Sequence, residues 1–175
     1  MILRIIFHII LVLLTFGFQL SVLNGFWGWL GFLNLGLVIL IFVLELNGFY
    51  WGLGWALGLG VLYDIFYFQT FGIFILSFLL AALVSQFLLS KFFTNRSLYS
   101  YLALIVAATI FLEIFPRLLI FILNFYSTGS EFFLASKDFA ILLGKSLLVN
   151  GVAVFISFYL FNFLSTRFNE VFLRK

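Results

Sequence analysis

Apolar segments of about bilayer length follow one another along almost the whole chain, and this succession limits the fold more than any other feature. A helix needs about 20 apolar residues to cross the hydrocarbon core of a bilayer. Six such segments use most of the 175 residues and leave no room for a soluble domain. Hydrophobic residues make up 66% of the chain and charged residues 9%, whereas soluble domains have roughly 45–50% and 25%. The sequence therefore predicts an all-α integral membrane protein.

We expect one transmembrane domain over residues 1–175, folded as a bundle of about six helices in the lipid bilayer. The first apolar run follows Arg4, as in a secretory signal, but it has no small-x-small cleavage site, so we interpret it as an uncleaved span. The predicted spans are residues 2–23, 31–46, 48–67, 71–92, 98–123 and 139–163.

Positive charges predict the orientation, because lysine and arginine gather in short cytoplasmic loops. With six spans, both termini and the loops after spans two and four lie on one side. That side has Arg4, Lys91, Arg96, Arg167, Arg174 and Lys175, and the other has Arg117, Lys137 and Lys145. We therefore expect both termini in the cytoplasm and Asp64 near the outer surface. Charges placed at segment ends indicate topology, and we expect no nucleic-acid partner.

The residue inventory argues against enzymatic chemistry. The chain has no cysteine, so thiol, disulfide and iron–sulfur chemistry are excluded, and its one histidine is too few for a histidine-based metal site. No Ser/His/Asp grouping, paired carboxylates, P-loop or HExxH motif is present. We expect no catalytic residue, no metal site and no cofactor.

Glycines form two rows at helical spacing in the third span. Small residues four apart allow helix backbones to approach closely in lipid. We therefore expect this helix to pack on two sides and to be central to the bundle. Asp64 continues the first row, and we interpret it as an anchor or cap of that end of the helix. The rows are Gly48, Gly52, Ala56 and Gly60, and Gly54 and Gly58.

The fifth span contains both Glu113 and Arg117. An acid four residues before a base is the favourable helical order, and pairing offsets part of the cost of each charge in lipid. We interpret them as a self-neutralising intramembrane ion pair; the alternative is a proton or ion relay. Pro116 between them is expected to kink the helix. Lys145 either extends outward or pairs with Glu113 or Asp64.

Several of these features occur in an order known from one bacterial family. Asn34 opens the second span, and the run from Gly54 to Asp64 closes a glycine-rich span with an acid. Phe71-Gly72 follows a short turn, and the basic loop 96–98 leads into the span that holds Glu113. In this order the chain resembles the MreD family, the small membrane subunit of the bacterial rod-shape (elongation) machinery.

The resemblance implies a non-enzymatic, multi-pass scaffold of the bacterial cytoplasmic (inner) membrane. Such a scaffold binds the transmembrane helix of MreC, and through it acts with MreB and with RodA and its transpeptidase in peptidoglycan synthesis. The implied fold is similar to the substrate-binding subunit of energy-coupling-factor transporters. The matching motif positions are Gly54, Gly58, Gly60, Asp64 and Gly72.

The alternative function is a small-solute (vitamin) binding subunit of such a transporter. Those subunits dock on their partner through Ala-x-x-x-Ala in the first span. The first span here has no alanine, and the first alanine of the chain is Ala56. Polar residues that could line a ligand pocket are also few. Both observations favour the scaffold.

Overall fold

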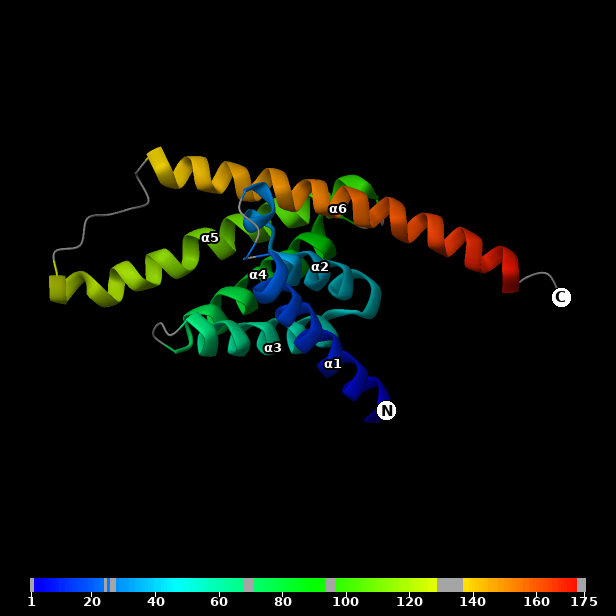
Figure 1. Cartoon of the computed structure of the whole chain (residues 1–175), viewed down its shortest axis with the longest axis horizontal. Coiled ribbons are helices and arrows are strands. Elements are labelled where there is room, and N and C mark those ends of the chain that lie inside the picture. Colours follow the sequence, from blue (N-terminus) through cyan, green and yellow to red (C-terminus); the bar gives the residue numbers. More distant parts are fainter. Residues whose placement is uncertain are drawn as a thin grey trace.

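The structure is a computed structural model that describes residues 2–23, 25, 28–67, 71–93, 97–128 and 137–172, and its described part is helical without any strand (Figure 1). The predicted all-α fold is confirmed. A π-helical turn, η1, extends the first helix, and a 3-10 turn, η2, precedes the second. The elements are α1 (Ile2–Phe18), η1 (Gln19–Leu23), η2 (Trp29–Phe32), α2 (Leu35–Asn47), α3 (Phe49–Tyr67), α4 (Ile73–Lys91), α5 (Leu98–Thr128) and α6 (Lys137–Phe172).

Five of the described helices are long and apolar enough to cross a membrane, which supports a multi-pass protein. The other helix, α2, has 13 residues and is therefore about 20 Å long, whereas a hydrocarbon core is about 30 Å thick. The predicted second span, residues 31–46, thus contains a helix that begins at Leu35, with η2 before it. The five candidate spans are Ile2–Val22, Phe49–Tyr67, Ile73–Lys91, Leu98–Leu123 and Lys137–Phe163.

The central helix is α2, so the expectation that the glycine-rich helix is central is wrong. α2 contacts each of the other five α-helices, and Leu37 and Ile41 on it are fully buried. A helix that is apolar all round can be surrounded by other helices. α3 packs chiefly against α1, α2 and α4 and leaves Tyr50 and Ile65 exposed.

The two longest helices, α5 and α6, pack side by side along one edge of the bundle (Figure 1). α5 continues through Pro116, and α6 has 36 residues, about 54 Å at 1.5 Å per residue. The C-terminal end of α6 extends past the other helices (Figure 1).

The start of α2 lies inside the bundle, where side chains must satisfy its backbone, since each unsatisfied backbone group in lipid costs several kcal/mol. Asn34 caps the helix by accepting a hydrogen bond from the Leu37 N–H at 3.0 Å. The Asn34 N–H donates to Asn150 Oδ1 of α6 at 2.8 Å. Gln19 accepts from the Leu35 N–H at 2.8 Å. Polar side chains from η1 and α6 therefore fix where α2 begins.

Candidate functional site

The first glycine row of α3 is the face that packs against α2 and α4. A Cβ atom built on Gly60 would lie 2.6 Å from Ile75 Cα of α4, and one built on Gly52 would lie 2.2 Å from Leu44 Cδ2 of α2. Cβ atoms do not approach other heavy atoms that closely. Gly60 therefore allows the α3 and α4 backbones to touch, and Gly52 makes room for a buried leucine.

The second glycine row faces an open apolar groove between α1 and α3, with a volume of about 490 Å³. A Cβ on Gly58 would meet Val12 Cγ1 of α1 at 3.2 Å, whereas a Cβ on Gly54 would meet nothing within 4 Å. The groove is lined from α1 by Ile5, His8, Ile9, Val12 and Leu13, and from α3 by Trp51, Gly54, Trp55, Leu57, Gly58, Val61 and Leu62.

A polar and aromatic cluster joins α1 to α3 at one end of this groove. The Trp55 Nε1–H donates to His8 Nδ1 at 3.0 Å, and the His8 and Trp51 ring centroids are 4.2 Å apart. The Arg4 guanidinium lies over Trp51, 5.0 Å from the ring centroid. These contacts hold the two walls of the groove together near the N-terminus of α1.

Gly48 and Gly72 have a conformational role. Their φ angles are +90° and +103°, values that residues with a Cβ rarely adopt. Gly48 ends α2 with a hydrogen bond from its N–H to the Leu44 carbonyl, and Gly72 precedes α4. A Cβ on either would meet nothing within 4 Å, so neither is a packing position.

Asp64 connects the end of α3 to the start of α4. One carboxylate oxygen accepts from the Gly72 and Ile75 N–H groups at 2.9 and 3.2 Å, and the other accepts from the Phe74 N–H at 2.9 Å. The first N–H groups of a helix lack intrahelical partners, and the positive end of the helix dipole favours an anion there. Asp64 is 3% exposed, so its carboxylate stabilises this helix pair and is not presented to a ligand.

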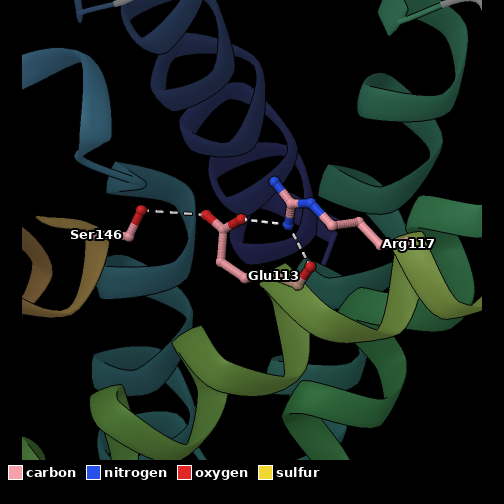
Figure 2. Close-up of polar contacts among 3 residues, drawn as sticks. All are labelled: Glu113, Arg117 and Ser146. Atoms are coloured by element: carbon pink, nitrogen blue, oxygen red, sulfur yellow. Dashed lines mark hydrogen bonds and ion pairs between the residues drawn. The ribbon is translucent and has the colours of Figure 1, made fainter. Parts of the chain in front are cut away.

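Glu113 and Arg117 are in contact, as their spacing indicates. Arg117 Nη1 lies 2.6 Å from Glu113 Oε2 and also donates to the Glu113 main-chain carbonyl. Ser146 of α6 donates to the other carboxylate oxygen at 3.2 Å, so Glu113 lies between Ser146 and Arg117 (Figure 2). Sequence reasoning missed Ser146; its position four residues before Asn150 places both on one face of α6.

The charged pair borders a cavity of about 450 Å³. The cavity lies where α1 and α3 end and where η1, α2, α4 and α6 begin, beside the middle of α5. From the sequence we expected few polar residues for a pocket, yet the fold brings several together from distant segments. The polar lining is Gln19, Asn34, Glu113, Arg117 and Ser146, and the aromatic lining is Phe32, Tyr63, Tyr67, Phe74 and Phe78.

A second cation lies beside this cavity. Lys145 Nζ is 5.1 Å from the centroid of the Phe32 ring, and the Arg117 guanidinium is 4.8 Å from the centroid of Phe139. In the part of the chain that the structure describes, Lys145 pairs with neither Glu113 nor Asp64. Rings stabilise both cations without neutralising them.

Comparison of the chain with protein-family models, with curated proteins and with solved structures found no match. Within the described residues, no group of three or more His, Cys, Asp or Glu side chains could hold a metal ion. The candidate functional features are therefore the groove between α1 and α3 and the cavity beside Glu113 and Arg117.

Proposed function

We propose that the protein is a non-enzymatic membrane scaffold of the bacterial cell-shape (elongation) complex. In this role it binds the transmembrane helix of MreC in the inner membrane. It thereby helps to link MreB to the peptidoglycan synthesis carried out by RodA and its transpeptidase. The proposal rests on the resemblance of the sequence to MreD and on one structural observation, the open glycine-lined groove between α1 and α3.

The groove suits a transmembrane helix for two physical reasons. Helices associate in lipid by close approach of their backbones over small residues. A Cβ atom built on Gly54 would have no heavy atom within 4 Å, so a partner helix has room there. The α3 wall extends from Trp51 to Leu62, about 16 Å at 1.5 Å per residue, or about three turns of a partner helix.

The walls of the groove are fixed. Asp64 and Gly60 hold α3 to α4 on the face away from the groove, and the hydrogen bond between Trp55 and His8 joins the two walls at one end. A partner helix would therefore dock on a preformed surface, which lowers the entropy lost on binding. The orientation with both termini in the cytoplasm belongs to the same proposal.

The alternative function, a vitamin-binding transport subunit, is less well supported. α1 has no alanine with which to form the expected docking motif. Gene neighbourhood separates the two functions: an adjacent MreC-like reading frame supports the scaffold, and adjacent ATPase subunits support transport.

The direct experiment is capture of MreC by the Gly54→Leu variant. The leucine side chain would occupy open space in the groove, so the chain should fold while MreC capture falls. Gly151→Leu is the matched control, because a Cβ on Gly151 of α6 also meets nothing within 4 Å. Capture at the wild-type level by Gly54→Leu, with both variants folded, would show that the groove is not the MreC site.

A further inference from the structure

We propose that the cavity beside Glu113 and Arg117 binds a small anionic amphiphile. Such a molecule has a carboxylate or phosphate head and a short apolar body. This site is separate from the proposed scaffold function, which uses the groove on another face of α3.

The charges at the cavity favour an anion. Arg117 lines the cavity and Lys145 lies over its wall residue Phe32, whereas Glu113 is the one carboxylate among the described lining residues. Asp64 lies outside the lining, and backbone N–H groups of α4 and its cap surround its carboxylate. Among the described residues at the cavity, two cations therefore face one carboxylate, and this excess of positive charge favours an anionic ligand.

Arg117 has donors left for a ligand. Its hydrogen bonds within the described residues both leave from Nη1, one to the Glu113 side chain and one to its carbonyl. A guanidinium has five N–H donors in a planar fork. In Figure 2 the other terminal nitrogen makes no contact with Glu113 or Ser146. A ligand carboxylate or phosphate could accept hydrogen bonds there while Glu113 keeps its own.

The remaining walls fit a flat apolar body. Tyr63, Tyr67 and Phe74 pack against one another with ring centroids 5.4–5.7 Å apart, and Phe32 and Phe78 complete the aromatic lining. The volume of about 450 Å³ lies within the range of roughly 300–1,000 Å³ typical of small-molecule sites. The ligand could come from solution or be the headgroup region of an anionic lipid, because both present the same chemistry.

The test measures binding of 3-phenylpropionate to the full chain in phosphatidylcholine nanodiscs. Equilibrium dialysis against empty nanodiscs corrects for partition into lipid, and 3-phenylpropionamide is the neutral probe of the same shape. We expect saturable binding of the anion and at least about tenfold weaker binding of the amide, as for loss of a hydrogen bond to a charged group. Equal binding of the two probes, or no saturable binding, would overturn the proposal.

Variants at the ion pair should act in opposite directions. Arg117→Gln should weaken binding of the anion at least about tenfold, while Arg4→Gln, at the far end of α1, should leave it unchanged. Glu113→Gln should tighten binding, because Arg117 loses its competing carboxylate. The double variant Glu113→Gln/Arg117→Gln leaves neither charge unpaired and should bind as weakly as Arg117→Gln. Tight binding by a folded double variant would contradict the assignment.

Adding phosphatidylglycerol to the nanodiscs separates the two sources of ligand. If this lipid displaces 3-phenylpropionate in proportion to its content, the site takes a lipid headgroup; if the probe still binds, the site takes soluble acids. MreC capture by Arg117→Gln should equal that of the wild type, so failure of this proposal and failure of the scaffold proposal are distinguishable.

Discussion

Replacement of Gly60 by alanine tests whether the α3–α4 contact determines the stability of the bundle. The new Cβ would lie 2.6 Å from Ile75 Cα and 3.0 Å from Ile75 N. Both are backbone atoms in a helix, so rotation of a side chain cannot relieve the overlap. The two helices must separate, and separation lengthens the hydrogen bond from the Ile75 N–H to Asp64 Oδ2, which is 3.2 Å long.

The magnitude follows from three terms. Overpacking of a well-packed core costs typically about 1–3 kcal/mol. Weakening a hydrogen bond to a charged acceptor adds up to about 1.5 kcal/mol. The higher helix propensity of alanine than of glycine stabilises the folded chain by about 1 kcal/mol. The terms therefore give an expected net loss for Gly60→Ala of about 2 kcal/mol of unfolding free energy, between limits of about 0 and about 3.5 kcal/mol.

The assay is unfolding of the purified protein in mixed micelles by increasing SDS, followed by circular dichroism. Gly54→Ala is the matched control on the same helix, since a Cβ on Gly54 meets nothing within 4 Å. This control should be neutral or up to about 1 kcal/mol more stable than the wild type. Equal stability of Gly60→Ala and Gly54→Ala would refute the close backbone contact between α3 and α4.

Three further predictions concern the helix caps and the topology. Asp64→Asn should lower the unfolding free energy by about 1.5–3 kcal/mol, because the amide offers one acceptor oxygen and no charge to the three N–H groups at the start of α4; wild-type stability in the SDS assay would contradict this. Asn150→Leu should cost about 2 kcal/mol, because it leaves the Asn34 N–H inside the bundle without its acceptor; the same assay measures it, and a neutral effect would argue against this contact. Reporter fusions should place both termini in the cytoplasm, and an outward C-terminus would contradict the six-span topology.

Local sequence patterns predicted the local features of the fold. Hydropathy indicated where the long helices lie, because the length of an apolar run must match the bilayer. The contact between Glu113 and Arg117 followed from their separation of four residues on one helix. We expected Asp64 to anchor or cap the end of its own helix; in the structure α3 continues to Tyr67, and the Asp64 carboxylate caps the start of α4.

Features that depend on distant segments could not be predicted in this way. The start of α2 is set by Gln19 and by Asn150, whose contacts connect residues 16 and 116 positions apart. The cavity gathers its polar lining from η1, from the cap of α2, and from α5 and α6. The apolar composition of α2 also did not predict that the other helices surround it, because apolar side chains suit lipid and a helix interface equally well. These properties arise only when helices pack, and no single span encodes them.

The two glycine rows of α3 have different roles in the packed structure. From the sequence we expected both rows to be contact faces. In the structure, Leu44 occupies the space beside Gly52 and the Ile75 backbone occupies the space beside Gly60. The space beside Gly54 is open. A scaffold needs a body that is fixed and one surface that is not yet occupied, and the opposite faces of one helix supply both. The same residue type on the same helix should therefore give separate phenotypes: substitution at Gly60 should lower stability, and substitution at Gly54 should lower partner binding in a chain that still folds.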